Sequence, residues 1–303
     1  MGSSSPPAPA PKHLLAIFGP TASGKTALAG VLRERLGATV ISADSAALYR
    51  DLPVITAAPD YPTELVGVVP LEQDVSVGWY PRAAQAAIAR SERPLVAGGT
   101  GLYFRAALAA LELPPAVPER RGHWRAEVQR LGPEAAHALL AERDPAAAAR
   151  VHPNDAKRVV RALELAEAGH SLAPEHDRLW TEDTRVPTTI VALELPLDEL
   201  DRRIAERTRA MAAAGAADEA RAAWSRPLAA TARKVLGLEE FATMPADEAV
   251  EAVAAATRKL ARYQRKWLRR LPNVLVLDAG RPPEELADAV VALDSAGEQL
   301  PRR

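Results

Sequence analysis

Eight residues near the start of the chain, Gly19 to Thr26, have the types and spacing of a loop that binds phosphate groups. They read Gly-Pro-Thr-Ala-Ser-Gly-Lys-Thr and fit the pattern Gly-x4-Gly-Lys-Ser/Thr. An apolar run at 14–18 precedes them and a helix-forming stretch at 27–36 follows, which is the strand–turn–helix context that such a loop needs. Backbone N–H groups would surround phosphate oxygens, Lys25 would bridge oxygens on the outer phosphate, and Thr26 would hold Mg²⁺. The alternative, a glycine-rich turn that binds nothing, is disfavoured because the spacing and both flanks agree.

An acidic residue, Asp44, follows the second apolar run at 38–42. Ligands of open α/β sheets bind at the carboxyl ends of the strands, so Asp44 would face the same crevice as the phosphate loop. Its carboxylate could there hold Mg²⁺ through water or accept a proton from a nucleophile. Aspartate also favours helix N-caps, and position alone leaves the chemical and the capping interpretations open.

A glycine-rich turn, Gly98-Gly99-Thr100-Gly101, follows the third apolar run at 94–97. The glycines would permit close approach of the backbone to a ligand, and the Thr100 hydroxyl adds a hydrogen-bond donor. Turns of this kind between a strand and a helix are also common as plain structure, so the segment alone does not establish a site.

Five short apolar segments, each bounded by turn or polar residues, are predicted to be buried strands. They lie at 14–18, 38–42, 94–97, 189–195 and 273–278. Helical patterns lie between most of them, which predicts a parallel sheet with helices on its faces. The predicted fold class is therefore α/β, a P-loop NTPase-like parallel sheet flanked by helices, with an all-helical insertion domain.

The pattern changes between the third and fourth predicted strands. Residues 113–118, Leu-Pro-Pro-Ala-Val-Pro, form a proline-rich break, and 119–172 has a wholly helical pattern with breakers inside it. We therefore predict a helical insertion domain at 114–186. The predicted division is a disordered leader at 1–11, a core at 12–113 and 187–296 that includes a basic C-terminal helix, the insertion, and a loose tail at 297–303.

Composition excludes several kinds of site and partner. The 303 residues include no cysteine, so neither a disulfide nor a thiolate metal site is possible, and the six histidines lack ligand spacing. No apolar run reaches membrane length and no secretory signal is visible, so we expect a cytoplasmic protein without a membrane partner. We also expect a monomer. The net charge of −1 hides an asymmetry, because 257–270 carries seven basic residues and no acidic one.

Taken together, these motifs resemble those of the tRNA dimethylallyltransferases, also called tRNA isopentenyltransferases. The phosphate loop has that family's form, Asp44-Ser45 followed by Tyr49-Arg50 matches its second motif, and Gly98 to Tyr103 matches its third. Further matching segments follow in the family's order and are Asn154 to Glu164, Arg207 to Gly215, Lys234 to Glu240 and Thr257 to Arg269. The resemblance runs from about residue 14 to residue 278.

The resemblance implies transfer of the allyl group of dimethylallyl diphosphate to the N6 amine of the adenosine next to the tRNA anticodon, adenosine-37, with release of diphosphate. Asp44 would accept a proton from the amine, Thr100 would position donor and base, and Arg207 would reach the diphosphate. For Arg207, an ion pair with Glu206 or Asp201 is the alternative. The residues implied in diphosphate binding are Gly19, Thr21, Ala22, Ser23, Gly24, Lys25 and Thr26, with Mg²⁺ at Thr26.

A tRNA acceptor requires a grip on the RNA backbone, because the target base must be splayed out of the anticodon loop. On a predicted helix at 248–270, arginines recur at steps of four, three and four, a stripe that suits phosphates but is also common on solvated surfaces. The residues of this helix assigned to tRNA binding are Arg258, Arg262, Gln264, Arg265 and Arg269. The neighbouring face assigned to the core is Val253, Ala256, Leu260, Tyr263 and Trp267.

A second patch assigned to tRNA binding is Lys157, Arg158 and Arg161 on the insertion. Arg161 could equally pair with Glu164 within its own helix, so both interpretations stay open for that residue.

The chain departs from the family's pattern on the acceptor side of the pocket. Ala46-Ala47 replace a Met-Gln pair, Ile55 to Pro59 lacks a lysine, and Tyr61 to Leu65 lacks two histidines. Loss of the glutamine removes an amide that could read or brace adenine. Diphosphate binding is therefore better supported by the sequence than adenine recognition.

Three alternatives to tRNA prenylation stay open. An adenylate isopentenyltransferase would use free AMP, ADP or ATP as acceptor, but it would need neither a helical insertion nor a basic helix. A small-molecule kinase would explain the phosphate loop and not the later motifs. A tRNA-binding relative that has lost transferase activity would fit the altered acceptor positions.

Overall fold

The structure, a computed structural model, describes residues 13–76, 78–111, 118–173 and 178–296. The chain forms two compact units, which we name the core unit (Met1–Val75, Trp79–Ala110 and Glu182–Arg303) and the helical unit (Ser76–Gly78 and Leu111–Thr181). The predicted leader at 1–11 and tail at 297–303 lie outside the described residues.

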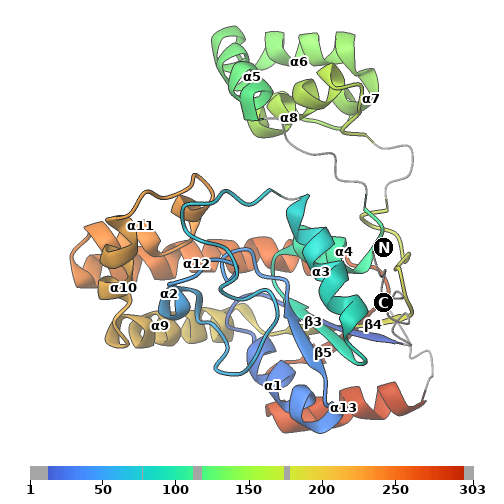
Figure 1. Cartoon of the computed structure of the whole chain (residues 1–303), viewed down its shortest axis with the longest axis vertical. Coiled ribbons are helices and arrows are strands. Elements are labelled where there is room, and N and C mark those ends of the chain that lie inside the picture. Colours follow the sequence, from blue (N-terminus) through green and yellow to red (C-terminus); the bar gives the residue numbers. More distant parts are fainter. Residues whose placement is uncertain (1–12, 77, 112–117, 174–177, 297–303) are drawn as a thin grey trace, which may run out of the picture. The chain divides into compact units, whose positions relative to one another are not determined.

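One five-stranded sheet forms the centre of the core unit (Figure 1). Its strands are β1 (Leu14–Phe18), β2 (Thr39–Ser42), β3 (Pro94–Gly98), β4 (Thr188–Glu194) and β5 (Val274–Asp278). They run parallel in the order β2-β3-β1-β4-β5. The predicted α/β class is confirmed, and each strand begins and ends within about one residue of its predicted position.

The alternation of side chains along β1 divides the core unit into two apolar layers. Leu14, Ala16 and Phe18 pack into one layer, while Leu15 and Ile17 pack into the other. Because both faces of this strand are buried, it consists of apolar residues throughout, as expected of a central parallel strand.

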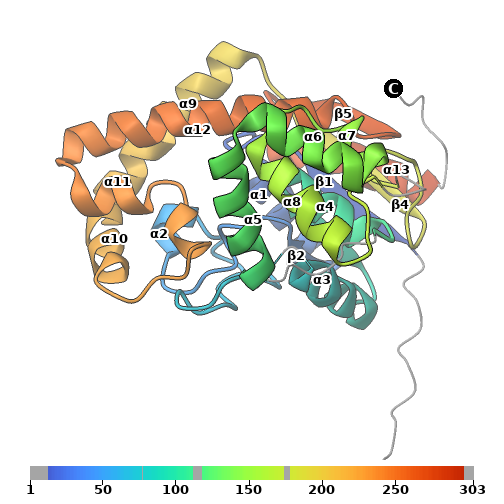
Figure 2. The same ribbon diagram turned by 90° about the horizontal axis from the view of Figure 1, so that it is seen from above.

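Helices cover both faces of the sheet (Figures 1 and 2). Buried residues of α1 (Lys25–Leu36), α9 (Leu197–Ala213) and α13 (Pro283–Ala296) belong to the layer of Ile17. Buried residues of α3 (Trp79–Arg90) and α4 (Gly101–Leu108) belong to the layer of Phe18. The remaining helices of the core unit are α2 (Pro53–Thr56), α10 (Ala216–Trp224), a 3-10 turn (Ala232–Lys234), α11 (Leu238–Thr243) and α12 (Ala246–Leu268).

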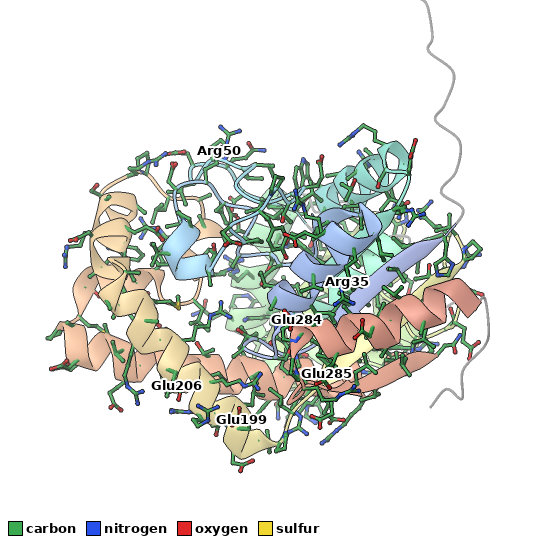
Figure 3. The ribbon with its side chains drawn as sticks, turned by 90° about the horizontal axis from the view of Figure 1, so that it is seen from below. Arg35, Arg50, Glu199, Glu206, Glu284 and Glu285 are labelled. Carbon is green, nitrogen blue, oxygen red and sulfur yellow. The ribbon has the colours of Figure 1, made fainter. Side chains whose placement is uncertain are left out.

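The long helices α9 and α12 lie side by side (Figure 2). Each helix has acidic residues in its first turn, where their negative charge interacts favourably with the positive end of the helix dipole. They are Asp198 and Glu199 in α9 and Asp247 and Glu248 in α12. Figure 3 shows Glu199 and Glu206 along the outside of α9, and both pair there with Arg202. The same view shows Arg35 of α1 beside α13, where it pairs with Asp288.

The buried face of α12 differs from the predicted one. Val253 is 1% exposed as expected, but Leu260 and Tyr263 are 38% and 57% exposed. The buried residues in this part of the helix are instead Ala261, Gln264 and Leu268, while Trp267 of the predicted face is partly buried and packs against the core as expected. The three buried residues follow a helical spacing of three and four, so the prediction is wrong at Leu260 and Tyr263, where the buried positions are Ala261 and Gln264. The prediction followed the apolar side chains alone and therefore missed Gln264, whose polar side chain is buried.

The helical unit contains α5 (Pro118–Leu131), α6 (Pro133–Arg143), α7 (Pro145–Ala148) and α8 (Ala156–Glu167). Trp124, Leu140, Val159 and Leu163 are among the residues of its own apolar core. Proline opens α6 and α7, and Asp144 caps α7 through the Ala147 N–H at 2.9 Å, as the predicted breaker positions require. None of the helices in the described part of either unit is long and apolar enough to cross a membrane.

Candidate active site

The phosphate loop, Gly19 to Thr26, connects β1 to α1, so its last residues form the N-terminus of that helix. Gly24 has φ 87° and Ala22 has φ 63°. Glycine adopts this left-handed conformation freely, whereas alanine does so at a cost of about 1–2 kcal/mol. The loop thus has an anion-binding helix N-terminus and a strained alanine that other contacts must hold in place.

Lys25 turns back into the loop, where its Nζ donates a hydrogen bond of 2.6 Å to the Pro20 carbonyl. The pKa of Lys25 is lowered to about 8, mainly by burial; the Asp44 carboxylate opposes this shift and the nearby Arg207 guanidinium adds to it. Burial also lowers the pKa of Arg207, again opposed by Asp44. Two cations beside a helix N-terminus, each with its charged form disfavoured by burial, favour an anionic ligand.

Arg207, on α9, reaches the phosphate loop. Its guanidinium donates to the Thr21 hydroxyl at 3.2 Å. The alternative ion pairs are not formed in the described part of the chain, since Glu206 pairs with Arg202 and Asp201 pairs with Arg262. A forked donor held at the loop suits a diphosphate oxygen.

Asp44 lies at the end of β2, half-buried, within electrostatic reach of both Lys25 and Arg207. Its Oδ1 accepts a hydrogen bond of 3.0 Å from the Ala46 N–H. Residues 45–48 form a turn and not a helix, so Asp44 caps a turn and the predicted alternative of a helix N-cap is wrong. Within the described residues Oδ2 accepts no hydrogen bond, which leaves one carboxylate oxygen available for chemistry.

Thr100 supports the turn that carries Asp44. Its hydroxyl oxygen accepts a hydrogen bond of 3.1 Å from the Ser45 N–H and lies 3.3 Å from the Ser45 hydroxyl. The Thr100 N–H in turn donates to the Ala43 carbonyl at 3.2 Å. The end of β3 therefore fixes the end of β2 from both sides of Asp44.

The glycines of the 98–101 turn are required by the protein's own packing. A Cβ at Gly98 would lie 2.3 Å from the Ala43 carbonyl oxygen. At Gly99 it would lie 2.4 Å from Gln264 Nε2, and at Gly101 it would lie 2.1 Å from the Trp267 ring. Here the sequence indicated close approach of a ligand, whereas the structure shows close approach of β2 and α12.

Gln264 is only 5% exposed, and its Oε1 accepts a hydrogen bond of 2.7 Å from the Thr21 N–H of the phosphate loop. Its assignment as a tRNA contact is wrong, because a buried side chain bonded to the loop cannot meet RNA at the surface. The available sequence signal was its position between Ala261 and Leu268, at the spacing of an inward face.

The arginines of the basic stripe on α12 differ in their exposure to solvent and in their ion pairs. The Arg262 side chain is 52% exposed and pairs with Asp201 at 3.1 Å, whereas that of Arg265 is 16% exposed and pairs with Glu194 at the end of β4. Arg269 is exposed just beyond the end of α12. Arg258 is partly buried and faces α9.

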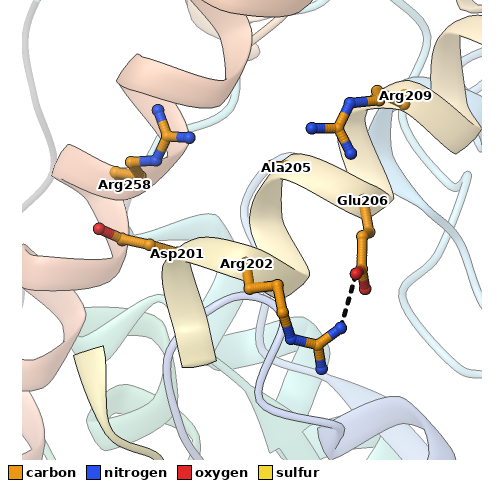
Figure 4. Close-up of a pocket in the computed structure, with 6 residues that line it drawn as sticks. All are labelled: Asp201, Arg202, Ala205, Glu206, Arg209 and Arg258. Atoms are coloured by element: carbon orange, nitrogen blue, oxygen red, sulfur yellow. Dashed lines mark hydrogen bonds and ion pairs between the residues drawn. The ribbon is translucent and has the colours of Figure 1, made fainter. Parts of the chain in front are cut away.

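Arg258 lines a surface hollow of about 630 Å³ between α9 and α12 (Figure 4). The other lining residues are Asp201, Arg202, Ala205, Glu206 and Arg209. In Figure 4 the guanidinium groups of Arg258 and Arg209 point toward each other, and neither is ion-paired in the described part of the chain. Two facing cations in a hollow offer a second place for a phosphate, separate from the phosphate loop.

In the helical unit, Lys157 and Arg158 are exposed on the first turn of α8, and Arg158 pairs with Asp155 at 3.5 Å. Arg161 pairs with Glu164 at 2.8 Å, so the alternative interpretation of Arg161 describes the structure. Because the Glu164 side chain is only 2% exposed, Arg161 neutralises a buried charge.

The donors at the phosphate loop fit a Mg²⁺ ion held jointly with a diphosphate. Thr26 is exposed on the first turn of α1, and the buried Ser23 hydroxyl has no hydrogen-bond partner. The described residues contain no group of three acidic, histidine or cysteine side chains that could hold a metal by themselves. Mg²⁺ usually binds through few protein ligands together with substrate phosphates and water, which agrees with this donor set.

Tyr61, at one of the departures from the family pattern, packs against the phosphate-loop helix. Its hydroxyl donates 2.7 Å to the Thr26 carbonyl, and burial raises its pKa to about 12. Its ring would contact a Cβ at Gly30 at 3.0 Å. Tyr61 therefore packs against and stabilises α1. This structural role does not depend on the two histidines that the family pattern has in this segment and this chain lacks.

With the site described, comparison with known proteins identifies the family. The sequence profile described as IPP transferase matches residues 47–271, and that described as Isopentenyl transferase matches residues 12–68. The chain belongs to the IPP transferase family.

Relatives of this IPP transferase family member agree along most of the chain. It is 42% identical over 295 residues, covering 92% of this chain and 99% of the relative, to the tRNA dimethylallyltransferase of Anaeromyxobacter dehalogenans (strain 2CP-C). It is 41% identical over 309 residues, 92% of this chain and 96% of the relative, to that of Kineococcus radiotolerans. The resemblance inferred from the motifs is confirmed.

Solved structures share the fold of this IPP transferase family member. The tRNA isopentenylpyrophosphate transferase of Bacillus halodurans superposes with a TM-score of 0.66 at 27% identity, over 94% of this chain and 96% of that one. A eukaryotic dimethylallyltransferase acting on tRNA superposes with a TM-score of 0.76 at 21% identity, over 96% of this chain and 81% of that one. The latter similarity concerns the fold alone.

Proposed function

We propose that this protein transfers the dimethylallyl group of dimethylallyl diphosphate to the N6 amine of adenosine-37 in tRNA and releases diphosphate. The observation that carries the proposal is the meeting of two cations and one carboxylate at the phosphate loop: Lys25 bonds to the Pro20 carbonyl, Arg207 bonds to the Thr21 hydroxyl, and Asp44 lies within electrostatic reach of both. The relatives named tRNA dimethylallyltransferase support the choice of tRNA as acceptor.

The phosphate loop binds the leaving group of this reaction and not a transferred phosphoryl group. As the allylic C–O bond breaks, the carbon gains positive charge and the diphosphate gains negative charge. Lys25, Arg207 and the loop N–H groups stabilise that negative charge. Mg²⁺ held at Thr26 would supply further charge neutralisation to the diphosphate oxygens.

Asp44 takes the proton that leaves the N6 amine as the N–C bond forms. The amine lone pair is delocalised into the adenine ring, so a positioned base increases its reactivity, typically by about 10²–10⁴-fold. Oδ1 is engaged by the Ala46 N–H, which leaves Oδ2 for the proton. Thr100 keeps the carboxylate in position through Ser45.

The tRNA is held by cationic side chains around α12. Arg262 and Arg269 are exposed, and Arg258 with Arg209 offers a phosphate site in the hollow between α9 and α12. We assign Lys157 and Arg158 of the helical unit to RNA as well, since both are exposed on the first turn of α8. A tRNA acceptor is consistent with a cytoplasmic monomer, the location and state that we propose.

Labelled dimethylallyl diphosphate, offered with unmodified tRNA or with AMP, tests the proposal. We expect label in tRNA only, at adenosine-37 after nuclease digestion. Label in AMP would indicate an adenylate isopentenyltransferase. Tight tRNA binding without any label would indicate a relative that has lost transfer, and a phosphorylated product from ATP would indicate a kinase.

A further inference from the structure

The amide of Gln264 joins α12 to the phosphate loop across 243 residues of sequence. It is one of the few buried polar side chains of the core unit and sits on the inward face of a helix whose opposite face is basic. A glutamine buried among apolar neighbours is unfavourable unless both ends of its amide are accommodated. Its place therefore needs a local explanation.

The first part of that explanation lies in the loop backbone. Thr21 is held twice, by Gln264 Oε1 at its N–H and by the Arg207 guanidinium at its hydroxyl. The next residue is Ala22, the alanine with φ 63°. Contacts that fix Thr21 hold the strained backbone of Ala22 in the conformation that continues to Gly24 and Lys25.

The second part lies in the 98–101 turn. Gly99 is where a Cβ would lie 2.4 Å from Gln264 Nε2, so the turn provides the space that the amide occupies. One helical turn further, Trp267 occupies the space left by Gly101. The two glycines thus admit two side chains of α12, and one of the two reaches the phosphate loop.

We propose that Gln264 is a positioning residue for the diphosphate site: it orders the loop backbone at Thr21 so that the loop N–H groups and Lys25 are arranged for the leaving group before it binds. The inference deepens the proposed function and rests on it for the identity of the ligand. It predicts that removal of the amide weakens diphosphate binding selectively and leaves the RNA surface of α12 intact.

The test measures inorganic pyrophosphate affinity by calorimetry, tRNA affinity by filter binding, and the melting temperature. Gln264→Met keeps the length and volume of the side chain but leaves the Thr21 N–H without its acceptor. We expect pyrophosphate affinity to fall about tenfold and tRNA affinity to stay within about twofold. Gln85→Met is the matched control, because it removes a glutamine bond to the Ala107 carbonyl between α3 and α4, and it should leave both affinities unchanged.

A reciprocal variant tests the same contact from the other side. A Cβ at Gly99 would lie 2.4 Å from Gln264 Nε2 and 3.0 Å from the Gly19 carbonyl oxygen, so Gly99→Ala displaces the amide and also crowds the start of the loop. It should weaken pyrophosphate binding at least as much as Gln264→Met does. The double variant should bind no more weakly than Gly99→Ala alone, since Gly99→Ala has already displaced the Gln264 amide. Additive losses would overturn the inference.

Two further outcomes would also overturn it. One is pyrophosphate affinity in Gln264→Met equal to that of the unaltered protein. The other is an equal loss of pyrophosphate affinity and tRNA affinity, accompanied by a lower melting temperature. That result would show that Gln264 stabilises the fold and has no specific role at the diphosphate site. Prenyl transfer by the unaltered protein is measured in parallel, so a protein that binds pyrophosphate but transfers nothing refutes the proposed function and leaves the role of Gln264 decided separately.

Discussion

The phosphate loop and the basic stripe of α12 are both cationic, yet they are built in opposite ways. At the loop, Thr21 is held by side chains from two distant helices, and Lys25 already points into the loop. On α12, Arg262 and Arg265 are tied to the carboxylates of Asp201 and Glu194, partners that they must share or release to contact RNA. Catalysis by preorganised charge needs the first arrangement, whereas a surface that docks a large polyanion tolerates the second.

The largest expected effect is loss of the base. Asp44→Asn retains the Oδ1 acceptor for the Ala46 N–H, so the turn is preserved, but the amide cannot take a proton. We expect kcat to fall by about 10²–10⁴-fold with tRNA affinity within about twofold. Single-turnover transfer and filter binding measure the two quantities. Equal losses in both would assign Asp44 to structure.

The next effect concerns charge in the phosphate loop. Lys25→Met should lower pyrophosphate affinity by about 10–100-fold, because it removes a charge-assisted hydrogen bond in a partly buried site.

The pH dependence of the same binding sharpens this expectation. With a pKa of about 8, Lys25 is charged below that pH and neutral above it in the free protein. Pyrophosphate affinity should therefore fall as the pH rises through 8. Lys25→Arg keeps its charge and should lose that slope, which calorimetry across pH 7–9 would detect. A slope that survives in Lys25→Arg would exclude Lys25 as its source.

A smaller effect separates two arginines of α12. Arg262→Ala should weaken tRNA binding about three- to tenfold and reduce the salt dependence by roughly one phosphate contact. Arg265→Ala should instead lower the free energy of unfolding by about 1 kcal/mol, because it leaves Glu194 without its partner. Salt titrations and urea unfolding test the contrast. If the two variants behave alike in both measurements, the exposed fraction of the arginine side chain does not determine which arginine contacts RNA.

The smallest effect is at Tyr61. Tyr61→Phe removes the hydroxyl that donates to the Thr26 carbonyl and should reduce the free energy of unfolding by about 1 kcal/mol. Pyrophosphate affinity should stay within about twofold, since the ring still packs against α1. A large loss of pyrophosphate affinity would instead place Tyr61 in the donor site.

Local pattern was sufficient to predict the sheet and the phosphate loop. Strands such as Leu14–Phe18 are short, wholly apolar and bounded by turns. The loop motif also predicts the strand before it and the helix after it. Asp44 and Thr100 could be placed near the loop because parallel strands end at one edge of a sheet.

The position of Gln264 could not be predicted in the same way, because its hydrogen bond joins residues far apart in the sequence. The composition of a basic segment predicts that a polar residue within it is exposed at the surface. Only the packing of α12 against the 98–101 turn shows that Gln264 is buried. Tyr263 and Leu260 were predicted to be buried because they are apolar, but they lie 57% and 38% exposed next to the buried positions Gln264 and Ala261.

The most direct test of the central claim is a crystal structure of the protein with inorganic pyrophosphate and Mg²⁺. The account predicts pyrophosphate at the phosphate loop, in contact with Lys25 Nζ and the Arg207 guanidinium, with the Asp44 carboxylate facing the same pocket. Pyrophosphate bound instead between Arg209 and Arg258, or an Asp44 carboxylate turned away from the loop, would contradict it.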